Sequence, residues 1–141
     1  MIIRKCTPDE YPLLAEVWER SVRATHTFLS EETISEIKDE LIPSYFPMVE
    51  IHVAVDDSLV MGFIGVAKDR IEMLFVDSCC QGSGVGSALI EFAIEQGAVE
   101  VDVNEQNPKA WKFYESKGFR VIGRDETDDA GRPYPILHLS L

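Results

Sequence analysis

The sequence predicts an α/β fold in which one mixed, mostly antiparallel sheet of about seven strands is flanked by about four helices. Apolar residues recur at helical spacing in some segments and at period two in others, with turn-forming residues between them. No run of Pro, Gly or Ser divides the 141 residues, and no internal repeat is visible. We therefore expect a single domain over residues 1–141.

The first third of the chain is predicted to be mainly helical. Residues 2–3 form a short strand, and residues 7–10 (Thr-Pro-Asp-Glu) have the pattern of a capping box with proline at the first helical position. Ser30, followed by two glutamates, predicts the start of a second helix. Because proline interrupts a helix, we expect this helix to end near Pro43 and Pro47.

From Ile51 the apolar period changes to two, which predicts strands. Residues 51–56, 59–67 and 71–76 are expected to form an antiparallel meander, followed by a glycine-rich turn and a helix. Residues 99–103 alternate between valine and polar residues and predict a half-buried strand.

The end of the chain is predicted to be one helix and two strands. Asn107 and Pro108 fit the N-cap and first position of a helix, and Gly118 fits its C′ position. Residues 120–141 are expected to form two strands joined by a turn at 128–131. The predicted order is β-α-α-β-β-β-α-β-α-β-β.

Composition narrows the functional class. The net charge of −12 argues against a nucleic-acid-binding protein, because no basic stripe is present to neutralise phosphates. It is compatible with a cationic acceptor substrate. No apolar run is long enough for a signal peptide or a membrane span, so no membrane partner and a cytoplasmic location are expected. The three cysteines form no metal-binding or disulfide pattern, and no metal site is predicted.

The main functional signal is the turn at residues 81–86 (Gln-Gly-Ser-Gly-Val-Gly), between a strand and a helix. Glycines permit close approach of a ligand to the backbone, and the following helix directs unpaired N–H groups at the turn, as phosphate binding requires. A dinucleotide-binding fold is one alternative. However, the dinucleotide-binding motif is G-x-G-x-x-G, whereas the glycines here are spaced G-x-G-x-G. Asp102 is the candidate ribose-binding acid by its distance from the turn, but it is predicted inside a strand and not at the end of one. The absence of Gly-Lys-Ser/Thr excludes a P-loop.

Two motifs together resemble the GNAT superfamily of acyl-CoA-dependent N-acyltransferases. The turn is similar to its Arg/Gln-x-x-Gly-x-Gly/Ala motif, and residues 107–119 contain its Asn, Ala and Tyr-x-x-x-Gly-Phe pattern. Residues 21–26 and 131–135 also look similar to a small bacterial branch of the superfamily, the YjaB-type acetyltransferases. The resemblance covers nearly the whole chain and implies an N-acetyltransferase.

The resemblance also implies where acetyl-CoA binds, as a co-substrate and without a metal. Backbone N–H groups of the turn would hold the pyrophosphate, the pantetheine arm would lie between two separating strands, and a bulge in the first strand would direct the N–H of Phe75 or Val76 at the thioester carbonyl. The predicted cofactor-binding residues are Leu74, Phe75, Val76, Gln81, Gly82, Ser83, Gly84, Val85, Gly86, Ser87, Asn107 and Tyr114.

Two proton transfers complete the implied mechanism. Tyr114 matches the family's general acid for the departing thiolate, and Glu72, a lone acid in an apolar strand, is the candidate base for the amine. No cysteine falls on a matched catalytic position, which favours direct transfer in a ternary complex. His26 and Phe28 are expected to line the acceptor pocket.

Two questions stay open at the level of sequence. The acceptor could be a small molecule or a peptide amine, since acceptor loops vary within a fold, and the oligomeric state has no sequence signal. A non-catalytic acyl-CoA-binding module and, less favoured, a dinucleotide-binding protein are the alternatives to the enzyme.

Overall fold

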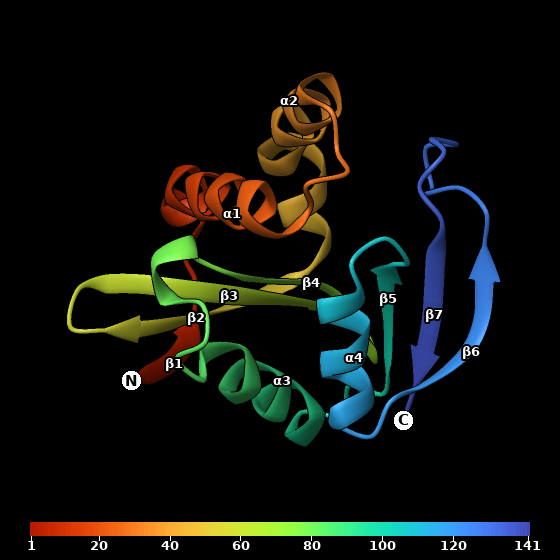
Figure 1. The fold of residues 1–141 in the computed structure, drawn as a ribbon. Helices are drawn as coiled ribbons and strands as arrows, with labels where there is room; N and C mark the ends of the chain where they lie inside the picture. Colours follow the sequence, from red (N-terminus) through yellow and green to blue (C-terminus); the bar gives the residue numbers. More distant parts are fainter.

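A seven-stranded sheet in the order β1-β2-β3-β4-β5-β7-β6 runs through the computed structural model, which describes all residues from 1 to 141 (Figure 1). The strands are β1 (Ile2–Lys5), β2 (Glu50–Asp56), β3 (Leu59–Ala67), β4 (Arg70–Val76), β5 (Glu100–Asn104), β6 (Arg120–Asp125) and β7 (Ile136–Ser140). The helices are α1 (Tyr11–Thr25), α2 (Glu31–Glu40), α3 (Val85–Glu95) and α4 (Pro108–Ser116). The predicted fold class and element order are confirmed.

Prolines lie where the first helix begins and just after the second helix ends, and a serine caps the start of the second. The capping box of Thr7 and Glu10 forms, but on a 3-10 turn (Pro8–Glu10), and α1 begins only at Tyr11. An α-helix from residue 8 would need an N–H at Pro12, which proline lacks. Ser30 caps α2 as predicted, accepting a hydrogen bond from the Thr33 N–H at 3.1 Å. Pro43 then falls in a π-helical turn (Leu41–Tyr45) that follows α2.

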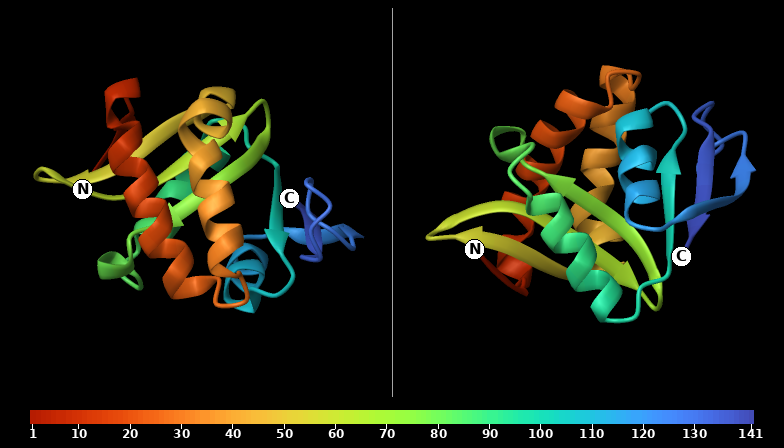
Figure 2. Two further views of the ribbon diagram at one scale, coloured as in Figure 1. Left: turned by 90° about the horizontal axis from the view of Figure 1, so that it is seen from above. Right: turned by 60° about the horizontal axis from the view of Figure 1, so that its bottom comes forward.

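Two apolar cores cover the two faces of the sheet. Helices α1 and α2 lie on one face, and α3 and α4 lie on the other (Figure 2). Leu14, Phe46 and Phe63 are fully buried on the first side, and Leu89 and Ile90 on the second. No helix of the structure is both long and apolar enough to cross a membrane.

The sheet opens between β4 and β5. These parallel strands pair only through Arg70 with Glu100 and Ile71 with Val101, and then diverge (Figure 1). Strand β4 also contains one extra residue, Glu72, because Ile71 and Met73 face consecutive residues of β3. Bulges increase local twist and bend a strand. The main chain of β4 beyond the bulge therefore borders a gap on its β5 side.

Candidate active site

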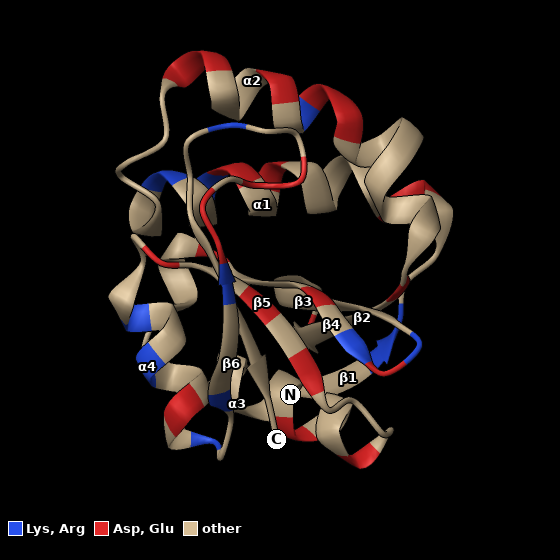
Figure 3. Cartoon of the chain, turned by 90° about the vertical axis from the view of Figure 1, so that its right-hand side faces the viewer, with Lys and Arg blue, Asp and Glu red and all other residues tan.

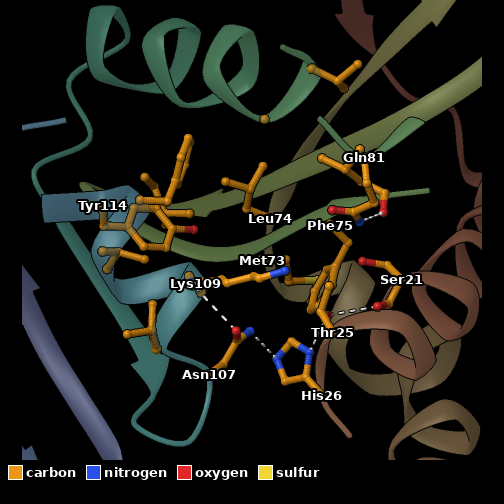
Figure 4. Close-up of a pocket in the computed structure, with 18 of the residues that line it drawn as sticks. Ser21, Thr25, His26, Met73, Leu74, Phe75, Gln81, Asn107, Lys109 and Tyr114 are labelled. Carbon is orange, nitrogen blue, oxygen red and sulfur yellow. Dashed lines mark hydrogen bonds between the residues drawn. The ribbon is translucent and has the colours of Figure 1, made fainter. Parts of the chain in front are cut away.

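A cavity of about 660 Å3 occupies the gap between β4 and β5 and extends to the glycine turn and α4. Figure 4 shows side chains from α1, β4, the turn and α4 converging on it. The sequence-predicted residues that line it are His26, Glu72, Leu74, Phe75, Val76, Gln81, Gly82, Gly84, Val85, Gly86, Ser87, Asn107 and Tyr114. Ser83 and Phe28 do not line it.

The glycine turn forms one end of this cavity. Gly82 and Gly84 have φ angles of +77° and +86°, and a Cβ atom on either would point into open space. Gly84 is also the N-cap of α3, so the unpaired N–H groups of the first helical turn lie directly beyond it. Such an N-terminus attracts anions. This end of the cavity therefore fits a diphosphate held by main-chain amides.

The neighbours of these glycines shape the turn from behind. The Gln81 Nε2 donates to the Val76 carbonyl at 2.8 Å, which ties the turn to the end of β4. The Ser83 hydroxyl donates back to the Cys80 carbonyl instead of entering the cavity. The Ser83 N–H also donates to this carbonyl, at 3.4 Å, so neither donor of Ser83 is directed at a ligand in the turn, in contrast to the prediction.

The main chain of β4 offers hydrogen-bond donors along the middle of the cavity. The Asp77 N–H donates to the Met61 carbonyl at 2.8 Å, so Asp77 belongs to the hydrogen-bonded pairs of the β3–β4 ladder. In an antiparallel ladder every second residue belongs to a hydrogen-bonded pair, so Phe75, two residues before Asp77, directs its N–H to β3. The N–H groups of Leu74 and Val76 therefore point the other way, to the gap. Of the two residues predicted to donate to the thioester carbonyl, Val76 is the one whose N–H faces the gap. The predicted bulge lies further upstream, at Glu72.

Tyr114 projects from α4 with its hydroxyl directed into the cavity (Figure 4). The ring is buried against Phe113 and Phe119, with centroid distances of 5.4 and 5.7 Å. The hydroxyl has no hydrogen-bond partner within the protein, and burial raises the pKa of this phenol above its usual value. Tyr114 is therefore a protonated donor available to a ligand.

Glu72 lies where this cavity joins a second one. The second cavity, of about 510 Å3, extends under α1 and α2 and shares His26, Glu72, Met73, Phe75 and Asn104 with the first. Burial raises the pKa of the Glu72 carboxyl, since the nearest cation, Arg70, is 3.8 Å away and binds Glu100 and Asp102 more closely. A carboxylate with a raised pKa at a junction of two cavities is suited to accept a proton.

His26 and Asn107 face each other across the cavity. The His26 Nε2 lies 3.5 Å from the Asn107 Nδ2, and its Nδ1 lies 2.8 Å from the Thr25 hydroxyl (Figure 4). That hydroxyl donates to the Ser21 carbonyl, so the imidazole donates from Nδ1 and accepts at Nε2. Burial lowers the pKa of His26 to about 4, so the ring is neutral. Phe28 packs on this ring, with centroids 5.5 Å apart.

Asn107 keeps its structural role as well. Its Oδ1 accepts from the Ala110 N–H at 3.4 Å and caps α4 as the sequence predicts. The side chain thus binds the helix with its oxygen and faces His26 with its nitrogen.

Sequence reasoning missed several residues of the first cavity. Ser21, Thr25, Cys80 and Lys109 all line it, and Lys109 extends across it from α4 (Figure 4). Lys109 stands inside the second sequence motif, which could have drawn attention to it. Ser21 and Thr25 lie in the stretch 21–26 that resembles the YjaB-type branch, but that resemblance assigns them no role, and the packing of α1 against β4 brings them to the cavity.

The chain belongs to the GNAT family of acetyltransferases. The family profile described as "Acetyltransferase (GNAT) domain" matches residues 15–134, which is most of the chain. This assignment confirms the predicted reaction class, an acetyl-CoA-dependent N-acetyltransferase, and replaces the dinucleotide-binding alternative.

Individual relatives agree with the family assignment. The peptidyl-lysine N-acetyltransferase YjaB of Escherichia coli (strain K12) is 41% identical over 140 residues, covering 98% of this chain and 95% of YjaB. The solution structure of apo-form YjaB superposes with a TM-score of 0.89 at 40% identity, covering 99% of this chain and 97% of that one. The resemblance to the YjaB-type branch is thus confirmed.

A more distant structure shows the same fold. The PaiA N-acetyltransferase of Thermoplasma acidophilum, solved in complex with coenzyme A, has a TM-score of 0.72 at 22% identity, covering 99% of this chain and 98% of that one.

Proposed function

We propose that this GNAT enzyme acetylates the side-chain amine of lysine residues in peptides or proteins, by direct attack while acetyl-CoA is bound. The observation that carries the proposal is the position of Glu72 at the junction of two cavities, one suited to a diphosphate-containing thioester and the other open to an acceptor. The relative YjaB, named as a peptidyl-lysine N-acetyltransferase, supports lysine as the acceptor.

The turn and β4 would hold acetyl-CoA. The main-chain amides after Gly84 would bind the pyrophosphate, and the outward N–H groups of Leu74 and Val76 lie along the gap that the pantetheine arm would fill. When bound, the thioester supplies an activated acetyl group. The Val76 N–H is the donor placed to stabilise negative charge on the carbonyl oxygen.

Glu72 would accept a proton from the amine, and Tyr114 would donate one to the leaving thiolate. Lysine arrives mostly as an ammonium, with a pKa near about 10.4, so the Glu72 carboxylate removes one proton before nitrogen attacks. As the new C–N bond forms and the C–S bond breaks, the Tyr114 hydroxyl is the donor available to the leaving sulfur, and the second proton that the nitrogen loses restores the phenol. Each role is typically worth about 10² to 10⁴ in rate.

The cysteines support direct transfer over a covalent enzyme intermediate. Cys80 is the cysteine that lines the first cavity, and burial raises the pKa of its thiol to about 11. A thiol that stays protonated is a poor nucleophile. All three cysteines are free, and a cytoplasmic location, where thiols stay reduced, is part of this proposal.

The decisive experiment combines acetyl-CoA with lysine peptides and records thiol release together with the mass of the peptide. We expect a gain of one acetyl group at the lysine side chain. CoA binding without turnover on any lysine peptide would contradict the proposal and favour a non-catalytic acyl-CoA-binding module.

Replacing Glu72 by glutamine is expected to lower kcat/KM by about 10²-fold at neutral pH, because the lysine amine then loses its proton acceptor. In the native enzyme, activity should rise with pH through the raised pKa of Glu72, and this limb should disappear in the variant. The deficit should shrink towards pH 10, where more of the amine is neutral by itself. Steady-state rates across this pH range measure both effects.

Glu100→Gln provides the matched control. Glu100 shares Arg70 with Glu72 but lines neither cavity, so its loss changes the local charge and leaves the proposed base in place. A similar loss of rate and of the pH limb in both variants would argue for a general charge effect and against Glu72 as the base.

A further inference from the structure

The second cavity is mostly apolar. Its eleven hydrophobic lining residues come from α1, the α1–α2 loop, α2, the turns that follow α2 and the strands β3 and β4. They are Trp18, Val22, Leu29, Ile37, Leu41, Tyr45, Met48, Val49, Ala67, Met73 and Phe75. Met48 is 74% exposed at its rim. The protein therefore leaves an apolar hollow open to solvent beside its reaction centre.

The polar residues of this cavity are few. They are His26, Glu72, Asn104 and Asp129, and the first three also line the first cavity. Most polar side chains of the second cavity thus lie where the two cavities meet. Ile37, Tyr45 and Met48 line the second cavity alone. An acceptor would present its nitrogen to the shared end and apolar groups to the other.

The charge of the cavity favours a cation. No Lys or Arg side chain lines it. Asp129, in the β6–β7 loop, has no salt-bridge partner, whereas the adjacent Asp128 binds Arg132 at 3.2 Å. Asp129 and Glu72 both line this cavity, and the negative charge of Asp129 contributes to the raised pKa of Glu72. Figure 3 shows further acidic residues along β5 and in this loop, which curves towards α2.

The β6–β7 loop is held in this position by contacts to α2. Arg132 binds Glu36 at 3.0 Å, and the Tyr134 hydroxyl lies 3.3 Å from the Thr33 hydroxyl. Asp129 therefore stands on a supported loop that forms one wall of the cavity.

The size of the cavity exceeds what a lysine side chain fills. Four methylenes and an ammonium occupy only part of about 510 Å3, and the remaining walls are apolar. An unfilled apolar wall gains affinity from an apolar group of the ligand, because burying hydrocarbon is favourable.

We propose that this cavity selects lysines that have a large apolar side chain beside them, the apolar side chain filling the space between Ile37 and Met48 while Asp129 and Glu72 receive the ammonium. The proposal rests on the lysine acetyltransfer proposed above. Nothing in the family assignment specifies such a subsite. The expected ligand is a peptide segment with one cationic amine next to one aliphatic or aromatic group.

A peptide series tests the apolar subsite. Peptides identical except for Leu, Ala or Glu next to a single lysine are compared as acceptors for the native enzyme. We expect kcat/KM for the leucine peptide to exceed that for the alanine peptide about tenfold, since the extra methylenes are buried, and the glutamate peptide to be the poorest. Equal kcat/KM values for all three peptides would overturn the proposal.

A cavity-filling variant locates the subsite. In Ile37→Trp the indole should occupy the apolar space, so the ratio of kcat/KM for the leucine peptide to that for the alanine peptide should fall below about twofold. Met48→Ser serves as a second variant, and it should have little effect on folding because Met48 is exposed at the rim. It should also reduce the preference for the leucine peptide. An unchanged preference in both variants would place the subsite elsewhere and contradict the proposal.

Asp129→Asn tests recognition of the ammonium. We expect KM for every lysine peptide to rise about fivefold and kcat to change much less, because the lost charge binds the acceptor and is only the smallest of the influences on the pKa of Glu72. Glu126→Gln is the matched control, since Glu126 has a 91% exposed side chain on the same loop and lines neither cavity. Equal KM values for Asp129→Asn and the native enzyme would remove Asp129 from the site.

The outcomes separate this inference from the proposed function. Acetylation of lysine peptides without any preference for the neighbouring residue would refute the subsite and leave the lysine acetyltransferase assignment intact. Absence of acetylation on every lysine peptide, with CoA binding retained, would refute both.

Discussion

Tyr114→Phe is expected to lower kcat by about 10² to 10⁴ while the affinity for CoA changes little. The substitution removes only the hydroxyl, which has no partner in the protein, so no buried group is left unsatisfied. The ring contacts with Phe113 and Phe119 remain. The loss should therefore appear in the departure of the thiolate and not in folding or binding.

The measurement for this variant is the rate of thiol release at saturating acetyl-CoA, together with a calorimetric titration of CoA. Tyr11→Phe provides a matched control, because Tyr11 also packs on a phenylalanine, Phe46, but lines neither cavity. It should retain native kcat. An unaltered kcat in Tyr114→Phe would exclude Tyr114 from the mechanism, and a large loss of CoA affinity would assign it a binding role instead.

The elements that the sequence predicts best are those specified by contiguous residues. The glycine turn is an example, since the positive φ angles of Gly82 and Gly84 and the start of α3 directly after them depend on local chemistry alone. The same holds for the caps at Ser30 and Asn107, whose side chains bond to the backbone three residues later.

Features that depend on distant contacts are harder to predict. The His26–Asn107 contact joins residues 81 positions apart, and no period or motif indicates it. The sequence predicts Phe28 in the acceptor pocket, but Phe28 lines neither cavity, and its ring packs between His26 and Tyr134, with centroids 5.5 and 5.9 Å away. The extra residue of β4 at Glu72 depends on how β4 pairs with β3, which the apolar pattern of a strand does not encode.

In the proposed function the two cavities of this acidic protein bind ligands of opposite charge, an anionic diphosphate in the first and a cationic ammonium in the second. Main-chain amides at the start of α3 can hold a diphosphate without cationic side chains, and carboxylates at the second cavity can then attract an ammonium. A basic patch for CoA would repel the proposed acceptor. The net charge of −12 is therefore compatible with binding an anionic co-substrate through the backbone.

Gly84→Val is expected to weaken CoA binding by about 10²-fold or more. Space for a Cβ is open on the protein side, so the new side chain would occupy the position where the structure can receive a diphosphate. Losing two charge-assisted hydrogen bonds of about 1.5 kcal/mol each gives about 3 kcal/mol, which corresponds to a factor of about 10². A calorimetric titration of CoA measures the effect.

Backbone strain must be separated from this loss of ligand space. Valine at a positive φ is strained wherever it is placed, so the variant should also unfold at a lower temperature. Gly97→Val carries the same strain, because Gly97 has a φ of +102° with open space around its Cβ position, but it lines neither cavity. If Gly97→Val loses comparable thermal stability yet binds CoA normally, the defect of Gly84→Val belongs to the ligand site. Normal CoA affinity in Gly84→Val would show that the diphosphate lies elsewhere.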